Sequence, residues 1–327
     1  MKAPVLSIVV PCYNEQDVFS LCLNELSSRM SEMKDKGKID RESHIVFVDD
    51  GSKDNTWRLI EEASSDSCLV KGVKLSRNKG HQTALMAGLS SCTTSDITVS
   101  IDADLQDDTA VIEKMVDSYL SGHDIVYGVR NDRTSDSFFK KFTAEAFYKV
   151  MTRLGVNQVE NHADFRLLSR RALNSLLQYK EQNLYIRGLI PLIGYPSDKV
   201  YYSRHERAAG ESKYPLRKML ALALEGITSF SVTPLRIVTA LGFIISILSS
   251  IGVIYTLAQY FLGHTVSGWA SMILAVLFIG GVQMLCLGVI GEYIGKIYME
   301  SKKRPKFFIE TKAGFDDGFN PKQHCNH

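Results

Sequence analysis

Residues 97–108 read Ile-Thr-Val-Ser-Ile-Asp-Ala-Asp-Leu-Gln-Asp-Asp, a short β-branched run followed at once by a dense acidic turn. Similar apolar runs occupy residues 6–10, 44–48, 70–75 and 124–129. Patterns typical of helices fall between these runs, at about 15–29, 54–63, 80–90 and 109–121. Strands and helices that alternate at this spacing predict an α/β domain with a mostly parallel sheet covered by helices on both faces.

Polar residues follow four of the five predicted strands. Ligands of such sheets bind beyond the carboxyl ends of the strands, so these residues predict one ligand-binding rim. They are Tyr13-Asn14-Glu15 after the first strand, Asp49-Asp50-Gly51-Ser52 after the second, residues 102–108 after the fourth and Arg130 after the fifth. Of the second group we expect Asp50 to bind ligand, while Asp54 or Thr56 caps the next helix.

The acidic turn suits a divalent metal ion. Side chains two residues apart share a face only on a regular strand. Because the chain turns after residue 101, the turn determines how Asp102 and Asp104 face one ligand. Mg²⁺ or Mn²⁺ bridging a diphosphate is typically held by one or two carboxylates plus phosphate oxygens, and Gln106 can add a neutral oxygen. Asp107 and Asp108 are explained equally well as caps of the following helix.

Several classes of protein are excluded by composition and motifs. A net charge of +2 without a basic run gives no case for a nucleic-acid partner. Six scattered cysteines without a C-x-x-C pair exclude a zinc framework and indicate reduced thiols in a cytoplasmic setting. Neither G-x-G-x-x-G nor G-x-x-x-x-G-K-[ST] occurs, which disfavours a dinucleotide fold and a P-loop.

Two stretches near the carboxyl end, 237–262 and 269–291, contain no Asp, Glu, Lys or Arg. As helices they would be about 39 Å and about 35 Å long, enough to cross a hydrocarbon core of about 30 Å. A buried hairpin of a soluble protein is the alternative, but the 236 residues that precede the two stretches could hardly cover both. Lys and Arg flank the outer ends and are absent from the turn at 263–268, which predicts that both ends face the cytoplasm.

The predicted organisation has four parts. Residues 1–213 form the cytoplasmic α/β domain, and 214–234 form an interfacial amphipathic helix or, alternatively, an ordinary core helix. Residues 235–298 form a transmembrane hairpin, and 299–327 form a cytoplasmic tail that is disordered from about 315. Glycines at 280–295 permit close packing between the two helices or between protomers of a homo-oligomer. The protein is therefore expected in the inner membrane as a multi-pass protein.

An ordered set of motifs resembles the family 2 glycosyltransferases of the GT-A (Rossmann-like) fold. The motifs are Pro11-Cys-Tyr-Asn-Glu15, Val48-Asp-Asp-Gly-Ser52, Asp102-Ala-Asp-Leu-Gln-Asp107, Tyr127-Gly-Val-Arg130, Ala163-Asp-Phe-Arg-Leu167 and Arg207-Ala-Ala-Gly-Glu-Ser-Lys-Tyr214. The resemblance is strongest to the polyisoprenyl-phosphate branch, which contains bactoprenol glucosyltransferases and dolichyl-phosphate mannose synthases. It implies a nucleotide-sugar donor, Mg²⁺ or Mn²⁺, and a polyisoprenyl phosphate acceptor at the membrane.

The resemblance also implies a specific reaction, the inverting transfer of glucose from UDP-glucose to undecaprenyl phosphate, as used in lipopolysaccharide O-antigen modification. N-acetylglucosamine, mannose and an aminoarabinose-type sugar remain open as the transferred group. A membrane scaffold that binds nucleotide-sugar without catalysis is the alternative of another class, and the complete acidic and basic motif set disfavours it. No Gln-x-x-Arg-Trp motif occurs, so a polymerising synthase is not expected.

Matching the motifs position by position implies roles for individual residues. Pro11, Tyr13, Glu15, Val48 and Asp50 match positions that hold the nucleoside of the donor. Asp102, Ala103, Asp104 and Gln106 match positions around the sugar and the metal, with Asp102, Asp104 and Gln106 as metal ligands. Arg207 and Lys213 match positions that face donor phosphates, and Arg130, Arg133 and Arg204 are candidates for the acceptor phosphate.

Asp164 matches the position usually assigned as the catalytic base, and Asp104 is expected to act with it. An acceptor phosphate monoester has a second pKa of about 6, so its oxygen is already an anion at pH 7. Asp164 would then orient groups near the nucleophile or stabilise positive character on the sugar rather than remove a proton. A helix N-cap ahead of Phe165 is the alternative for this residue.

Overall fold

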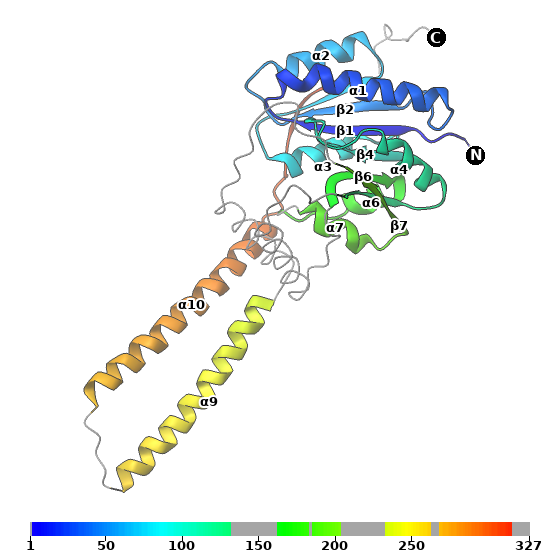
Figure 1. Cartoon of the computed structure of the whole chain (residues 1–327). Helices are drawn as coiled ribbons and strands as arrows, with labels where there is room; N and C mark the ends of the chain where they lie inside the picture. Colours follow the sequence, from blue (N-terminus) through cyan, green and yellow to red (C-terminus); the bar gives the residue numbers. More distant parts are fainter. Residues whose placement is uncertain (1, 132–161, 183–184, 204–232, 263–267, 316–327) are drawn as a thin grey trace. The chain divides into compact units, whose positions relative to one another are not determined.

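The structure, a computed structural model, describes residues 2–131, 162–182, 185–203, 233–262 and 268–315 (Figure 1). The chain divides into two units. The first takes in Met1–Tyr148, Asn157–Lys213 and Arg304–His327, and the second takes in Lys149–Val156 and Tyr214–Lys303.

The first unit is built on one eight-stranded sheet of order β7-β5-β6-β4-β1-β2-β3-β8. Its strands are β1 (Leu6–Cys12), β2 (His44–Asp49), β3 (Val70–Leu75), β4 (Ile97–Ser100), β5 (Ile125–Arg130), β6 (His162–Ser169), β7 (Ser197–Tyr202) and β8 (Ile309–Ala313). Its described helices are α1 (Gln16–Asp35), α2 (Thr56–Asp66), α3 (His81–Ser91), α4 (Val111–Leu120), α6 (Arg170–Leu177) and α7 (Ile186–Ile193). The five predicted strands and four predicted helices are all present, although α1 runs on past the predicted end at residue 29.

The pairing of the strands confirms the predicted mostly parallel sheet. β1 is parallel to β2 and to β4, β2 is parallel to β3, and β5 is parallel to β7. Strand β6 runs antiparallel between β4 and β5, and β8 runs antiparallel along β3. The chain therefore has the Rossmann-like α/β architecture of the GT-A fold, with one reversed strand inside the sheet.

Strands β1 and β2 are buried along their whole length and are apolar on both faces. Such strands need a layer of helices on each face of the sheet. Ile8 and Val10 belong to the core cluster that contains Phe19 of α1, Ile60 of α2 and residues of α4. On the other face, a Cβ added to Gly88 of α3 would lie 2.5 Å from Val9 and Val48, so α3 packs directly on the strands. Figure 1 shows α1 and α2 on one side of β1 and β2, and α3 on the other.

Within the segment predicted as a cytoplasmic tail, Ile309–Ala313 form β8 and cover the edge of β3. Lys74 pairs with Glu310 across the two strands at 3.2 Å. Gly314 has φ +72° and a Cβ there would lie 2.7 Å from the carbonyl oxygen of Val70, so only glycine fits this close approach. The pairing depends on contacts with β3, and the sequence around residues 309–313 does not predict these contacts.

Among the described cysteines, the prediction of a reduced thiol is wrong at Cys68. Cys68 is disulfide-bonded, whereas Cys12, Cys22 and Cys92 are free and buried. Burial raises the pKa of the Cys22 thiol to about 12, so this thiol is a packing group rather than a nucleophile.

The second unit contains two long helices, α9 (Thr233–Phe261) and α10 (Trp269–Ser301), which contact each other. Their lengths, about 44 Å and about 50 Å at 1.5 Å per residue, exceed the thickness of a bilayer core. Leu235–Gly252 and Phe278–Ser301 are long and apolar enough to cross a membrane, with mean hydropathies of 1.9 and 1.5, and neither stretch is buried. A Cβ at Gly280, Gly288 or Gly291 would meet no described atom within 4 Å, so the predicted packing of α9 on α10 through these glycines is not seen.

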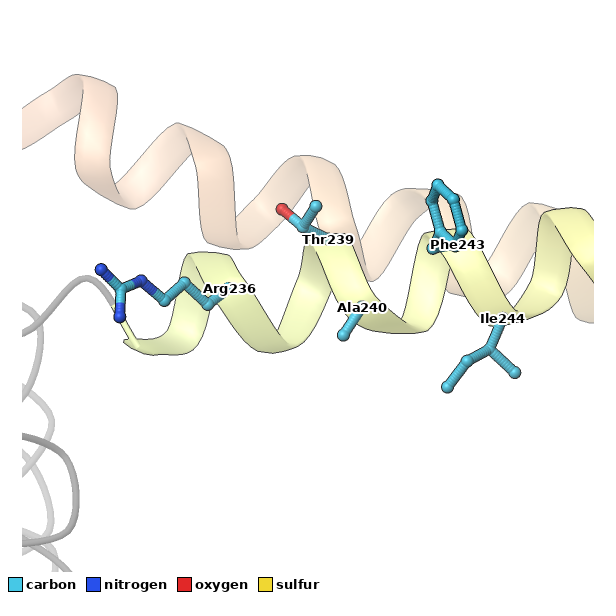
Figure 2. Close-up of a pocket in the computed structure, with 5 residues that line it drawn as sticks. All are labelled: Arg236, Thr239, Ala240, Phe243 and Ile244. Carbon is cyan, nitrogen blue, oxygen red and sulfur yellow. The ribbon is translucent and has the colours of Figure 1, made fainter.

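The amino end of α9 carries a cation next to an apolar surface. A pocket of about 500 Å³ is lined there by Arg236, Thr239, Ala240, Phe243 and Ile244. Figure 2 shows the Arg236 side chain extended toward the start of the helix, away from Phe243 and Ile244. This arrangement is typical of a helix end at a membrane surface, where arginine keeps its charge in water.

Candidate active site

Strand β6 brings Asp164 to the edge of the sheet where β1, β2 and β4 end. Ser100 of β4 pairs with Arg166 of β6 in an antiparallel register. Continuing this register by two residues sets Asp164 opposite Asp102, and the Ser100 hydroxyl donates to the Asp164 carbonyl at 2.6 Å. Because Asp164 lies in a strand, the alternative role as a helix N-cap is wrong.

Asp164 is buried, with a side chain only 5% exposed, and is surrounded by cations. The buried Arg166 guanidinium bonds to Asp164 Oδ1. Arg187 of α7 donates from Nε to Oδ1 at 3.2 Å and from Nη2 to Oδ2 at 3.1 Å. Burial alone would raise the pKa of Asp164, but Arg166, His81 and Arg187 outweigh it and hold this pKa well below its usual range. Asp164 is therefore a permanent carboxylate.

His81, the first residue of α3, lies between two of the acidic groups. Its Nε2 is 3.4 Å from Asp164 Oδ2 and 3.5 Å from Asp102 Oδ1. Burial lowers the pKa of His81, whereas Asp164 and Asp102 raise it further, so the net pKa is above the ordinary value. For Asp102 burial dominates and raises the pKa of the carboxyl. The imidazole thus connects the predicted catalytic residue to the predicted metal ligand.

Two of the three predicted metal ligands present buried oxygens with no hydrogen-bond partner, Asp102 Oδ1 and Gln106 Oε1. Leu105 between them has φ +52°, a conformation that costs energy outside glycine and that turns the chain after β4. No group of three or more His, Cys, Asp or Glu suited to a metal occurs within the described residues. A magnesium or manganese ion often takes only one or two protein oxygens. Gln106 Oε1 and Asp102 Oδ1, which has no hydrogen bond and lies 3.5 Å from His81 Nε2, therefore fit such an ion bound together with phosphate.

The loops after β1 and β2 are tied to each other. The Asn14 amide N–H donates to Ser52 Oγ at 2.9 Å, and the Glu15 amide N–H donates to Thr56 Oγ1 at 2.9 Å. Asp54, one of the two predicted caps, accepts the Thr56 amide N–H at 3.0 Å. These contacts fix the position of Tyr13, whose side chain is 41% exposed at this rim.

Asp50 holds the loop that leads into α3. Its Oδ1 accepts the Lys79 amide N–H at 2.7 Å and its Oδ2 accepts the Gly80 amide N–H at 2.8 Å. Burial raises the pKa of Asp50 in spite of these bonds. Asp50, predicted to bind ligand directly, therefore positions the backbone immediately before His81.

Arg130 is anchored by a carboxylate and a phenol. Its Nη2 donates to Asp107 Oδ1 at 2.9 Å, and Tyr202 donates its hydroxyl to the same oxygen at 2.6 Å. Asp107 is buried and is thus an anchor for Arg130 rather than a cap, whereas Asp108 accepts the Ala110 amide N–H at 3.0 Å as a cap would. The Arg130 side chain is 29% exposed, which leaves part of the guanidinium available to an anion.

The remaining predicted residues divide into three groups. Tyr13, Glu15 and Asp104 are partly exposed, while Pro11, Val48 and Ala103 are buried. The Val48 side chain packs beside Gly88 in the core, so its predicted contact with the donor is not available to the side chain. Four predicted phosphate-binding residues, Arg133, Arg204, Arg207 and Lys213, lie outside the described residues.

Sequence reasoning missed most of the groups around Asp164. His81 was visible only as a histidine near a predicted helix start, and Arg166 only as a letter in the Ala163–Leu167 motif. Gln82 and Arg187 gave no signal, although Gln82 Nε2 lies 3.4 Å from Asp164 Oδ2. Neither described pocket, on α9 or beside Tyr179 and Leu192, is lined by these residues.

Comparison with known proteins covers both units. Residues 7–177 match the family described as Glycosyl transferase family 2, and residues 233–297 match the GtrB C-terminal hairpin. The chain is 50% identical to the uncharacterized glycosyltransferase YkoT of Bacillus subtilis (strain 168), over 98% of this chain and 95% of YkoT. It is 40% identical to the bactoprenol glucosyl transferase of Shigella phage SfX, over 94% of this chain and 99% of that protein.

Two solved structures are also similar. The glucosyl-3-phosphoglycerate synthase of Mycobacterium tuberculosis, in complex with Mn²⁺, UDP and phosphoglyceric acid, is 20% identical with a TM-score of 0.46, over 69% of this chain and 76% of that chain. The mannosyltransferase PcManGT of Pyrobaculum calidifontis, in complex with GDP-Man and Mn²⁺, is 16% identical with a TM-score of 0.46, over 92% and 87%.

Proposed function

The chain belongs to glycosyl transferase family 2, and from that premise we propose that it transfers a sugar from a nucleotide-sugar donor to a polyisoprenyl phosphate in a membrane. Glucose from UDP-glucose is the proposed donor and undecaprenyl phosphate the proposed acceptor. N-acetylglucosamine, mannose or an aminoarabinose-type sugar would use the same chemistry. One observation carries the proposal: a permanent carboxylate, Asp164, lies beside Asp102 at the ligand-binding edge of the sheet in a chain that also carries two membrane-length helices.

The choice of acceptor is supported by the relatives and by the second unit. The bactoprenol glucosyl transferases align over more than nine-tenths of this chain, including the region of α9 and α10. A polyisoprenyl tail stays in the bilayer, so an enzyme that uses it must work at the membrane surface. Two unburied apolar helices are what such an enzyme needs.

The donor site is proposed at the ends of β1, β2 and β4. Tyr13 and Glu15 are the proposed contacts of the nucleoside, and Asp50 contributes by fixing the loop at Lys79 and Gly80. Asp102 and Gln106 would hold Mg²⁺ or Mn²⁺ through their buried oxygens, together with Asp104. When bound, such an ion supplies positive charge that stabilises the departing nucleoside diphosphate.

The proposed reaction inverts the anomeric carbon. An acceptor phosphate oxygen forms a bond to that carbon from one side, while the bond to the donor diphosphate breaks on the other and the diphosphate leaves with the electron pair. The acceptor oxygen is already an anion at pH 7, so proton removal is not required. Asp164 instead stabilises positive charge that develops on the sugar ring, as an anion held in place by Arg166 and Arg187.

The proposed location is the inner membrane, with the catalytic unit and both termini in the cytoplasm. Lys and Arg at the outer ends of α9 and α10, and their absence from residues 263–268, support this orientation. Arg133 and Arg204 are proposed for the acceptor phosphate alongside Arg130, and Arg207 and Lys213 for the donor phosphates. Arg207 and Lys213 are assigned from motif matches, and Arg133 and Arg204 are assigned as basic residues close to the motifs.

Membranes that contain the protein would test donor, acceptor and metal together. Labelled UDP-glucose, UDP-N-acetylglucosamine and GDP-mannose are each incubated with undecaprenyl phosphate, with and without EDTA. We expect one donor to give a labelled lipid that EDTA abolishes, and Asp164→Asn to prevent its formation. The matched control, Asp117→Asn on the exposed face of α4, should retain activity. Nucleotide-sugar binding without any labelled lipid would instead support the scaffold alternative.

A further inference from the structure

The carboxylate of Asp164 has more positive charge around it than it needs. Arg166 is only 1% exposed and already supplies a charge-assisted bond to Asp164 Oδ1. Arg187 adds a second guanidinium that spans both carboxylate oxygens. Two guanidinium groups therefore face one carboxylate, and these three groups together carry an excess of positive charge.

Arg187 differs from Arg166 in being reachable from solvent. Its side chain is 39% exposed, although the carboxylate that it holds is buried. Nε and Nη2 bind Asp164, and Nη1 makes no hydrogen bond within the parts of the chain that the structure describes. A guanidinium has a flat fork of donors, so one edge can hold a carboxylate while the remaining N–H groups bind a phosphate.

The position of Arg187 is fixed by the protein rather than by Asp164 alone. Arg187 is the second residue of α7, and the Ile186 amide N–H at the start of this helix donates to Gln82 Oε1 at 3.1 Å. Gln82 follows His81 in the first turn of α3, and both side chains lie close to Asp164 Oδ2. A cation held at both its backbone and its guanidinium loses little freedom on binding an anion.

The proposed reaction needs a cation at this point. The nucleophile is a phosphate anion, and it must approach a rim that also carries the carboxylates of Asp102 and Asp104. Like charges at contact distance repel strongly where water is excluded. An exposed guanidinium attached to Asp164 cancels this repulsion where the attacking oxygen arrives.

We propose that Arg187 binds the phosphate of the acceptor and holds its attacking oxygen beside Asp164. This inference rests on the proposed function, and it adds a phosphate-binding residue on α7 that the motif matches do not include. Arg187 is thereby a substrate-binding residue that couples acceptor recognition to Asp164.

Steady-state kinetics of Arg187→Gln with undecaprenyl phosphate test the proposal. A charged hydrogen bond is worth about 1.5–3 kcal/mol, so we expect kcat/KM for the acceptor to fall about 10- to 150-fold. The dissociation constant of the nucleotide-sugar should change less than about 3-fold. Arg187→Lys keeps the charge but loses the paired N–H donors of the guanidinium. Its kcat/KM for the acceptor should lie between those of the unmodified protein and Arg187→Gln. An unchanged acceptor kcat/KM in Arg187→Gln overturns the proposal, as does an equal loss of donor affinity.

Arg171 is a matched control because it also makes a two-point ion pair with a buried carboxylate, Asp124, away from the rim. Arg171→Gln should leave both the kcat/KM for the acceptor and the dissociation constant of the nucleotide-sugar unchanged. Absence of transfer by the unmodified protein with every donor would refute the proposed function itself, which is a different outcome from an insensitive Arg187→Gln.

Chemical modification of the unaltered protein gives an answer that does not depend on the variants folding. Phenylglyoxal modifies exposed arginines, and peptide mapping reports the rate at Arg187 and at Arg171. Farnesyl phosphate should slow modification at Arg187 and leave Arg171 unaffected, while farnesol should protect neither. Equal rates at Arg187 with and without farnesyl phosphate overturn the proposal, and protection by farnesol would show that the lipid tail rather than the phosphate is bound.

Discussion

Replacing Asp164 with asparagine tests whether its charge, rather than its shape, is needed. The substitution leaves Arg166 buried without its carboxylate, and breaking a buried ion pair typically costs about 3–5 kcal/mol of stability. The reaction also loses the fixed anion that we assign to stabilising the sugar, an effect of about 100- to 1000-fold in kcat. Asp164→Asn should therefore lose both stability and activity.

A double variant separates the two losses. Asp164→Asn combined with Arg166→Met removes both charges and fills the space of the arginine with an apolar side chain. Replacing a buried ion pair in this way is often neutral or stabilising, so stability should largely return. Activity should not return, because the carboxylate is still absent.

The assay pairs initial transfer rates at saturating donor with denaturant unfolding of the same samples. Asp124→Asn is the control, since Asp124 is also buried and paired with an arginine, Arg171, but lies away from the rim. It should lose stability and keep kcat. The reasoning is refuted if the double variant transfers sugar at close to the unmodified rate.

Three further predictions follow from other sites. Gly51→Ala should cost about 1–3 kcal/mol, because Gly51 has φ +67° and the new Cβ would lie 2.7 Å from the Arg77 carbonyl carbon; thermal unfolding measures it. Gln106→Ala should weaken Mn²⁺ binding about 10-fold or more, measured by calorimetry. His44 should make the fold less stable as the pH falls from 6.5 toward 4, by about 3 kcal/mol in denaturant titrations, because burial lowers the pKa of His44 to about 4 and only the unfolded chain takes up the proton.

Each of these has a control that the chain supplies. Gly37 has a similar φ of +64° but open space around it, so an equal loss in Gly37→Ala would attribute the Gly51 effect to backbone strain alone. Gln178→Ala, near α6, should leave Mn²⁺ binding unchanged. His44→Gln should flatten the stability curve between pH 4 and 6.5, and an unaltered curve would assign the pH dependence to other groups.

The sequence predicted the sheet well because its inner strands are apolar on both faces. Strands β1, β2 and β4 can be recognised from their own apolar runs, without knowing which strands they pair with. The acidic and polar residues come directly after these strands in the chain. The polar residues at the strand ends, the acidic turn at 102–108 and the two long apolar stretches were all visible in the sequence. A resemblance to a family then supplied a role for Asp164 that its local pattern does not indicate.

The surroundings of Asp164 were decided by tertiary structure. Its position opposite Asp102 comes from the antiparallel register of β6 on β4, and the Arg187 and His81 contacts come from the starts of two helices far apart in the chain. Strand β8 likewise depends on the free edge of β3. The apolar pattern of a short segment indicates which of its residues are buried, because this pattern is contained in the segment itself. Which strands pair, and in what register, depends on contacts between distant segments, and a single sequence does not record these contacts.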